Sequence, residues 1–262
     1  MKILVLLAGV ADIRFPLHPI SLNSESLIQE QGSPRRLLGP FDEAALEVAL
    51  KLRDVRPDTQ IDVLLLDGCN SENLLRSVAA FCPDSLQCLQ LEPCQPWDAR
   101  QTAAQIAGLI KRDYLAHDLV LMGRELGDLD EGSIAVLLAR RLGRPQLAMA
   151  QFGQWQDAQL WLMRERGTCE EWLKVDQPLL ASVTNDRRNK LRHPLLKNVM
   201  QAKRMTFTQV TASAPRRTGL SLSQLETAPL IARGGQCRLL SGDVTEQAQA
   251  LIGWLKEQGV NS

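Results

Sequence analysis

The stretch LVLMGRELGDLDEGSIAVLLARRLG (residues 119–143) decides the fold. It opens on an apolar run that is typical of a strand and closes on a run that is typical of a helix. The loop between the two runs combines glycines with acids. These residues are Gly123, Gly127, Gly132, Asp128, Asp130 and Glu131. A strand, a glycine-rich loop and a helix in this order predict one part of a βαβ unit.

The same order recurs along the chain as far as about residue 145. Strand-like apolar runs lie at 2–10, 61–68, 86–93 and 118–123, and helix-like patterns lie at 41–54, 71–81, 98–113 and 133–142. The apolar runs lack period-2 polarity, which is typical of parallel strands that are buried on both faces. The alternation therefore predicts an α/β fold, with an open and mostly parallel sheet flanked by helices. Asp42 is expected to cap the helix over 41–54.

The remaining segments follow other patterns. Residues 21–40 are polar and broken by Gly and Pro, so we expect a loop or an excursion there. Residues 159–166 and 170–186 resemble strands, which predicts a β-hairpin followed by a return to the main sheet. Residues 212–221 resemble a linker, and residues 244–259 form the pattern of an amphipathic helix.

Composition limits the class of protein. The 262 residues are 45% hydrophobic, and 30 basic residues balance 30 acidic ones, so no net field attracts nucleic acid. The six cysteines form no C-x-x-C pair, and only three histidines are present, so metal-site spacing is absent. The first apolar run is too short to cross a bilayer and lacks the features of a signal peptide. These observations predict a cytoplasmic protein with reduced thiols and without stable membrane insertion.

The loop that precedes Ser133 allows two interpretations. The start of a helix has free N–H groups and a partial positive charge, and ligands of open α/β sheets bind beyond the carboxyl ends of the strands. A phosphate could therefore bind there, with Ser133 as an additional donor. The acids of the loop would repel a phosphate if they faced it, whereas they could instead cap the helix or accept hydrogen bonds from a ribose. Because neither G-x-G-x-x-G nor a Walker motif is present, the local pattern favours a capped βα turn.

Five segments in one order carry a family resemblance. They are MKILVLLAGVAD (1–12), GPFDEAALEVALKLRD (39–54), DLVLMGRELGDLDEG (118–132), QPLLASVTND (177–186) and HPLLKNVMQAKR (193–204). Together they resemble the β subunit of electron transfer flavoproteins, over most of residues 1–210 and with nearly matching spacing. The resemblance indicates a diverged bacterial member with an adenine-nucleotide α-hydrolase-like fold.

The resemblance implies a heterodimer in which a larger α subunit carries most of the FAD site. The β subunit of this family holds an AMP that is structural. The complex accepts electrons from a flavin-dependent dehydrogenase and passes them toward the respiratory chain, so no catalytic residue is expected in this chain. Residues 1–210 would form the nucleotide-binding-like domain. Residues 211–262 would form a C-terminal arm and helix that contact the α subunit.

Carried over by position, the AMP site follows the ends of the strands and the loop quoted above. It would comprise Ala8, Phe41, Cys69, Gly123, Asp128, Asp130, Gly132, Ser133, Ile134 and Ala135. The chain departs from the family pattern at several of these positions. The family commonly has Lys-Arg at Ala8-Gly9, Asn at Gly39, Asp at Leu129 and Thr-Gly at Ile134-Ala135. Loss of the threonine hydroxyl removes one phosphate donor, and such a bond contributes about 1.5–3 kcal/mol.

The segment from Arg187 to Arg204 contains seven Lys or Arg residues and no acid. Its second part resembles the loop by which the family docks a dehydrogenase, with Leu196 at the position of the anchoring leucine. The docking residues would be Leu195, Leu196, Lys197 and Met200. An apolar anchor ringed by charges is a common arrangement at protein interfaces. The alternatives are a solvated basic surface, or a short helix that packs both leucines inward. Nucleic acid is disfavoured, because the segment has no aromatic side chain for base stacking.

The sequence therefore favours an electron-carrying β subunit that helps to enclose FAD. Two other hypotheses stay open. One is a stand-alone adenine-nucleotide-binding module, or sensor, of the universal-stress-protein type. The other is a degenerate structural partner with an empty pocket.

Overall fold

The computed structural model describes residues 1–15, 20–23, 28–30, 35–66, 72–92, 97–215, 222–226 and 239–259. The chain divides into two compact units, Met1–Leu225 and Glu226–Ser262. The first unit contains the sheets and all helices of the described residues except the last one.

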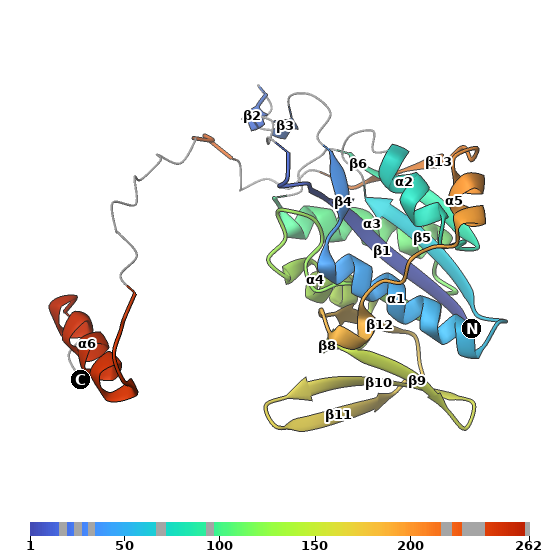
Figure 1. Cartoon of the computed structure of the whole chain (residues 1–262). Helices are drawn as coiled ribbons and strands as arrows, with labels where there is room; N and C mark the ends of the chain where they lie inside the picture. Colours follow the sequence, from blue (N-terminus) through green and yellow to red (C-terminus); the bar gives the residue numbers. More distant parts are fainter. Residues whose placement is uncertain are drawn as a thin grey trace. The chain divides into compact units, whose positions relative to one another are not determined.

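The first unit is built on a central parallel sheet (Figure 1). Its strands are β1 (Lys2–Ala11), β5 (Gln60–Leu66), β6 (Ser85–Glu92), β7 (Leu119–Gly123), β8 (Gln146–Ala150), β12 (Leu179–Val183) and β13 (Thr208–Ser213). They lie in the order β13-β6-β5-β1-β7-β12-β8, and every neighbouring pair is parallel. The predicted α/β fold with a mostly parallel sheet is confirmed.

Strand β1 shows why its sequence lacks polar alternation. Its residues are buried without interruption from Ile3 to Gly9. Ile3, Val5 and Leu7 belong to one apolar cluster, whereas Leu4, Leu6 and Ala8 belong to a second cluster. Because successive side chains of a strand point to opposite faces, the strand supplies both cores of the molecule.

Helices cover both faces of the sheet (Figure 1). Helices α1 (Pro40–Val55) and α2 (Glu72–Ala79) contribute to the first cluster, and α3 (Ala99–Asp113) and α4 (Ser133–Leu142) contribute to the second. The predicted cap of α1 is wrong. The helix begins at Pro40 with Gly39 as its N-cap residue, which places Asp42 inside the first turn.

Several strands are not predicted by the sequence pattern. The stretch 21–40, for which a loop or an excursion is expected, contains most of the antiparallel pair β2 (Ile20–Leu22) and β3 (Ile28–Glu30), and strand β4 (Arg36–Leu38). Strand β4 pairs antiparallel with the end of β1. Strands β8 and β13 of the main sheet were not predicted either, and β13 extends into the stretch that resembled a linker.

A separate antiparallel sheet consists of β9 (Phe152–Gln156), β10 (Gln159–Arg166) and β11 (Cys169–Lys174). The predicted hairpin is confirmed by the pairing of β10 with β11, and the predicted return to the main sheet is confirmed by β12. A short helix η1 (Arg187–Asn189) and helix α5 (Leu196–Ala202) follow β12.

The second unit contains helix α6 (Val244–Glu257), which confirms the helix predicted near the end of the chain. Asp243 and Glu246 form a capping box at its start. None of its residues is buried, and Leu251, Ile252 and Trp254 are about half exposed. No helix in the described ranges has both the length and the apolar content that a bilayer crossing requires.

Candidate functional site

The loop between β7 and α4 folds back over the end of β1. A Cβ atom added at Gly127 would lie 3.5 Å from the Ala8 Cβ. At Gly123, an added Cβ would come within 2.9 Å of the Glu125 carbonyl oxygen and 3.0 Å of the Phe41 Cβ. Such contacts leave no room for a side chain at position 123. Gly123 therefore lies against Phe41, and Gly127 lies against Ala8.

Asp130 organises the second half of this loop. One oxygen of its carboxylate accepts hydrogen bonds from the backbone N–H groups of Gly132 (3.0 Å), Ser133 (3.0 Å) and Ile134 (3.3 Å). The other oxygen accepts from Leu126 N at 3.0 Å. The side chain is 5% exposed. Since the N-cap residue Gly132 has no side chain of its own, Asp130 supplies the capping oxygen of α4. This geometry is that of the capped βα turn.

Asp128 connects the loop to strands β1 and β4. Its carboxylate accepts from Ala11 N at 3.0 Å and lies 3.4 Å from the guanidinium Nη1 of Arg36. The same Nη1 donates to the carbonyl of Gly9 at 3.0 Å. A Cβ atom at Gly9 would lie 3.2 Å from the Arg36 side chain and 2.7 Å from Leu74. An arginine from β4 thus packs against the position where the family commonly has its own Arg. None of the sequence motifs described above includes Arg36, so this contact was not predicted.

Asp42 lies at the start of α1 and points toward the same strand ends. Its carboxyl accepts from Ala8 N at 3.2 Å. Burial raises the pKa of Asp42 well above its ordinary value, while the hydrogen bonds from Ala8 and Gly39 oppose that shift. The second oxygen has no hydrogen-bond partner in the described part of the chain. A carboxyl group in this environment favours its protonated, neutral form.

The other residues of the predicted nucleotide site differ in their surroundings. Ile134 and Ala135 are each 1% exposed and pack into the second apolar cluster. Ser133 is the first residue of α4, as expected. Cys69 lies outside the described residues. The guanidinium of Arg124 stacks over the Phe41 ring, with 4.5 Å between Cζ and the ring centroid.

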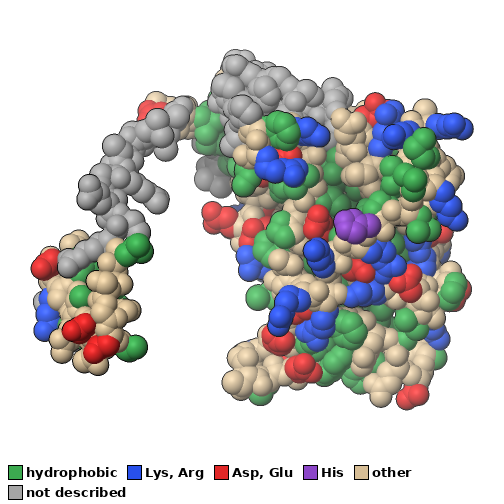
Figure 2. Space-filling view, in the orientation of Figure 1, with side chains coloured by type: hydrophobic (Ala, Val, Ile, Leu, Met, Phe, Trp, Pro, Cys, Tyr) green, Lys and Arg blue, Asp and Glu red, His purple; other side chains and the backbone are tan. Residues whose placement is uncertain are grey.

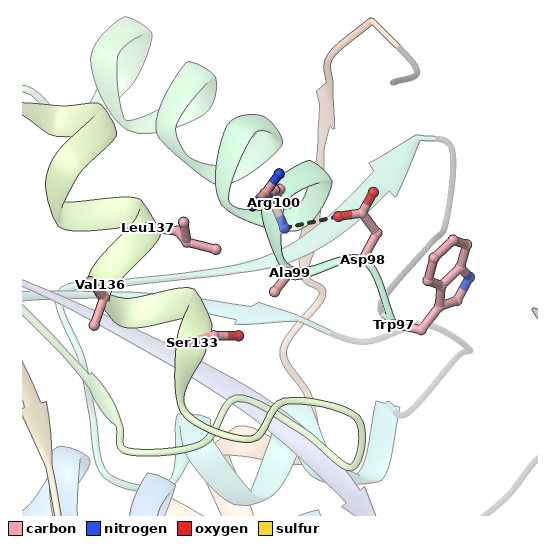
Figure 3. Close-up of a pocket in the computed structure, with 7 residues that line it drawn as sticks. All are labelled: Trp97, Asp98, Ala99, Arg100, Ser133, Val136 and Leu137. Atoms are coloured by element: carbon pink, nitrogen blue, oxygen red, sulfur yellow. Dashed lines mark hydrogen bonds between the residues drawn. The ribbon is translucent and has the colours of Figure 1, made fainter. Parts of the chain in front are cut away.

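A pocket of about 680 Å³ lies between the starts of α3 and α4 (Figure 3). Trp97, Asp98 and Arg100 line one side, and Ser133, Val136 and Leu137 line the other. The Asp98 carboxylate is already used, because it caps α3 through Arg100 N and Gln101 N. Of the predicted nucleotide-site residues that the structure describes, Ser133 alone lines this pocket.

The predicted docking residues lie on the surface of the first unit. Leu195 is 61% exposed, Leu196 is 77% exposed and Met200 is 50% exposed, and Lys197 is exposed as well. This exposure excludes the alternative in which both leucines pack inward. Ala202, at the other end of α5, is 1% exposed and packs with Ala79 and Ala80. Around α5, Lys and Arg side chains are scattered among apolar, acidic and other side chains (Figure 2).

A buried acid on α1 anchors the chain that leads to α5. Glu47 is 3% exposed, and its carboxylate accepts from the backbone N of Arg192 at 3.1 Å and from its guanidinium at 2.9 Å and 3.1 Å. The guanidinium also lies 2.7 Å from the Asp54 carboxylate. The sequence analysis missed Glu47, because 145 residues separate it from Arg192.

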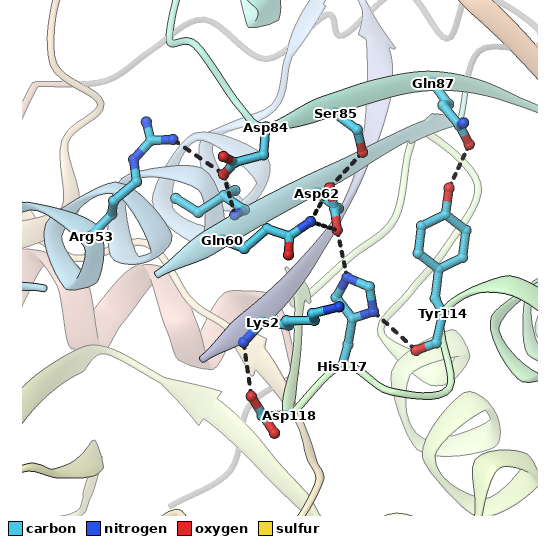
Figure 4. A network of polar contacts seen from close by, with 11 residues as sticks. Lys2, Arg53, Gln60, Asp62, Asp84, Ser85, Gln87, Tyr114, His117 and Asp118 are labelled. Atoms are coloured by element: carbon cyan, nitrogen blue, oxygen red, sulfur yellow. Dashed lines mark hydrogen bonds and ion pairs between the residues drawn. The ribbon is translucent and has the colours of Figure 1, made fainter. Parts of the chain in front are cut away.

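At the amino ends of the strands, a polar network surrounds Asp62 (Figure 4). Its carboxylate accepts from Ser85 Oγ at 2.6 Å and lies 2.7 Å from His117 Nε2. The Nδ1 of His117 faces the carbonyl of Tyr114 at 3.1 Å. Because Asp62 separates the serine from the histidine, the histidine cannot activate the serine as a nucleophile. The network joins the starts of β5, β6 and β7 instead.

Comparisons with known proteins now identify the family. The model of the electron transfer flavoprotein domain matches residues 27–215. The chain belongs to this family. It is 27% identical over 231 residues to the caffeyl-CoA reductase-Etf complex subunit CarD of Acetobacterium woodii, which covers 86% of this chain and 87% of CarD. It is 26% identical over 224 residues to the electron transfer flavoprotein subunit beta of Megasphaera elsdenii, with 81% and 83% coverage. Protein FixA of Azorhizobium caulinodans is 29% identical over 151 residues, which are 56% of this chain and 52% of FixA.

These relatives confirm the resemblance to β subunits of electron transfer flavoproteins. The family match and the names of these relatives support an electron transfer flavoprotein subunit of the beta type, and identities of 26–29% show that its sequence differs widely from theirs.

Proposed function

We propose that this chain is the β subunit of a heterodimeric electron transfer flavoprotein, which encloses FAD together with an α subunit and docks a flavin-dependent dehydrogenase. FAD supplies the redox chemistry when it is bound, and the protein supplies position and environment. The FAD in this proposal rests on family membership, and no residue of this chain is assigned to the flavin. We place the protein in the cytoplasm, with the respiratory chain as the destination of the electrons.

The observation that carries the proposal is the exposed leucine segment on a fixed support. An exposed pair such as Leu195 and Leu196 gains free energy when a partner covers it, by about 1.5–3 kcal/mol for each leucine that becomes fully buried. Glu47 fixes the chain before the pair, and Ala202 fixes the helix after it. A partner therefore meets a preformed anchor and does not have to order the segment first.

The second unit supports the heterodimer. Helix α6 leaves Leu251, Ile252 and Trp254 uncovered, and such side chains on one short helix favour burial against another chain. We propose that residues 211–262 form a C-terminal arm, which begins within the edge strand β13 and whose helix α6 contacts the α subunit, and that residues 1–210 form the nucleotide-binding-like domain.

Co-expression with the α-type subunit tests the proposal. The two chains should purify as a yellow 1:1 complex, whereas this chain expressed alone should be colourless. A stand-alone nucleotide-binding module, which is the other hypothesis, would need no partner and would bind an adenine nucleotide by itself. A colourless mixture in which the chains elute separately would refute the electron-carrier function.

The docking role has its own test. The reduction rate of the FAD by the dehydrogenase should fall when Leu196 is replaced by alanine. Leu115→Ala provides a matched control, because Leu115 is also an exposed leucine (59%) but lies two residues beyond the end of α3. Equal rates in the two variants would exclude Leu196 as the anchor.

A further inference from the structure

A groove with a basic rim runs between α3 and α4. The pocket at the starts of these helices continues into a second hollow of about 490 Å³, because Arg100 and Leu137 line both. Arg140 and Arg141 line the second hollow as well. Val136, which is 53% exposed, and Leu137 give the groove an apolar floor (Figure 3). We call the surface formed by these five residues the arginine groove.

The charge of these two helices is one-sided. The chain as a whole is neutral, and α1 and α2 on the other face of the sheet contain five acids and three Lys or Arg residues. Helices α3 and α4 contain a single acid, Asp113, and it pairs with Arg112 at 2.8 Å. The cations of α3 and α4 are Arg100, Lys111, Arg112, Arg140 and Arg141.

The arginines of the groove have no acid to pair with in the part of the chain that the structure describes. Arg100, Arg140 and Arg141 are exposed, and none of them forms an ion pair or a side-chain hydrogen bond there. Arg140 and Arg141 lie in the last turn of α4, where the helix dipole favours a cation. Arg100 lies in the first turn of α3, where the dipole disfavours one. Helix stability therefore does not explain Arg100, and an anion from outside the chain does.

The composition of the groove limits what can occupy it. In a two-fold symmetric dimer the same patch faces itself, so a second copy of this chain would place arginine against arginine. A nucleic acid would satisfy the arginines but would leave Val136 and Leu137 without an apolar partner. A protein segment that carries both carboxylates and an apolar side chain complements the groove fully, because arginine binds carboxylates through paired hydrogen bonds.

The start of the C-terminal arm lies beside this groove. Gln101, the neighbour of Arg100, is 1% exposed, and its Nε2 donates to the carbonyl of Ala214 at 3.0 Å. This bond fixes the arm directly after β13. The arm that we propose to contact the α subunit therefore starts next to Arg100. Among the proposed partners, the α subunit is the one that this position favours.

We propose that the arginine groove binds an acidic segment of the α subunit. Carboxylates of that segment pair with Arg100, Arg140 and Arg141, and an apolar side chain covers Val136 and Leu137. The groove is then a second contact with the α subunit, separate from helix α6 and from the exposed leucines of the docking segment. This inference rests on the proposed function, since it requires the heterodimer.

Charge reversal in the co-expressed heterodimer tests the electrostatic part. A dilution series followed by native mass spectrometry gives the dissociation constant of the two chains. Arg100→Glu and Arg140→Glu should each raise this constant about 10-fold or more, with a larger effect at low salt, because salt screens surface charges. An unchanged melting temperature of each variant chain checks that the fold is intact.

Lys174→Glu is the matched control. Lys174 lies on β11, is exposed, and has no ion pair among the described residues, so its reversal should leave the dissociation constant at the wild-type value. Equal constants in the arginine variants and this control would overturn the inference and leave the electron-carrier function standing. A wild-type chain that forms no heterodimer at all would instead refute the proposed function.

A zero-length cross-link identifies the occupant. Arg140→Lys keeps the charge and introduces an amine, which a carbodiimide couples to a carboxylate in direct contact with it. A cross-linked peptide that joins position 140 to an Asp or Glu of the α subunit supports the inference. A cross-link to an acid of this chain or of a second copy, or the absence of any cross-link from position 140 in the intact heterodimer, overturns it.

Discussion

Replacement of Glu47 by glutamine should weaken the support of the docking segment. The carboxylate accepts from Arg192 N at 3.1 Å, from Nε at 3.1 Å and from Nη2 at 2.9 Å, and Glu47 is 3% exposed. Glutamine keeps the shape of the side chain, but it removes the charge and turns an NH₂ group toward the guanidinium. Both changes act on the contact that holds the chain between β12 and α5.

The magnitude follows from the surroundings of the two side chains. A hydrogen bond to a charged group contributes about 1.5–3 kcal/mol, and bonds that share one carboxylate are not additive. The Arg192 side chain is 37% exposed and keeps its contact with Asp54 at 2.7 Å, so water and a second acid compensate for part of the loss. We therefore expect Glu47→Gln to lower the free energy of unfolding by about 2 kcal/mol, within the range for one charged hydrogen bond.

The reciprocal variant Arg192→Met should be more costly, at about 3 kcal/mol, because it leaves the buried carboxylate of Glu47 without its cation. Urea denaturation of the two single variants and the double variant gives the coupling energy between the side chains. Glu72→Gln is the control. Glu72 pairs with Arg76 on the surface of α2, and its side chain is 62% exposed, so its loss should stay below about 0.5 kcal/mol.

A loss below about 0.5 kcal/mol in Glu47→Gln would refute this reasoning, since the anchor would then be no stronger than a surface ion pair. If the anchor positions the docking residues, the Michaelis constant for the dehydrogenase should also rise while the maximal rate of flavin reduction stays near that of the wild type. An equal fall of the maximal rate would indicate a general loss of structure instead.

Three further variants test other parts of the account. Leu196→Ala should slow flavin reduction by the dehydrogenase about 10-fold or more, which corresponds to the loss of one buried leucine at the interface; an unchanged melting temperature checks that the fold is intact, and a rate equal to that of Leu115→Ala would contradict the docking role. Asp42→Asn keeps an acceptor for Ala8 N but cannot titrate. Because burial raises the pKa of Asp42, the native state binds this proton more tightly than the unfolded chain does. The stability of the wild type should therefore fall as the pH rises above about 4, and the stability of the variant should fall less. Parallel stability profiles of the two proteins in urea would count against this assignment. His117→Ala should lower the free energy of unfolding by about 1–3 kcal/mol, because Asp62 loses a buried hydrogen-bond partner, while the flavin content of the complex stays the same; a lower flavin content would show that the network reaches the cofactor.

The central part of the fold could be predicted from the sequence, because its strands are buried on both faces. Runs such as Ile3–Leu7 and Leu119–Met122 stand out as uninterrupted aliphatic segments, and helical patterns separate them. The strands that the sequence analysis missed are of other kinds. Strand β13 lies at the edge of the sheet and is mostly exposed, and β4 is three residues long in a stretch rich in polar residues. Short or exposed strands depend on their partners in the sheet, and this information is not local.

The candidate site shows the same limit. The loop, the start of α4 at Ser133 and the exposure of Leu196 could be anticipated, because each depends on a short segment. The bonds of Asp128 to Ala11 and of Glu47 to Arg192 join residues that are 117 and 145 positions apart. No pattern in a single sequence indicates such pairs. The resemblance indicated the family correctly, whereas the AMP site that it implied stays a prediction.

The native mass spectrum of the protein co-expressed with its α-type subunit tests the central claim most directly. Under conditions that preserve noncovalent contacts, the account predicts one species with the mass of the two chains plus a single FAD. A spectrum in which this chain appears only by itself, with or without a bound nucleotide, would contradict the claim that it is the β subunit of an electron transfer flavoprotein.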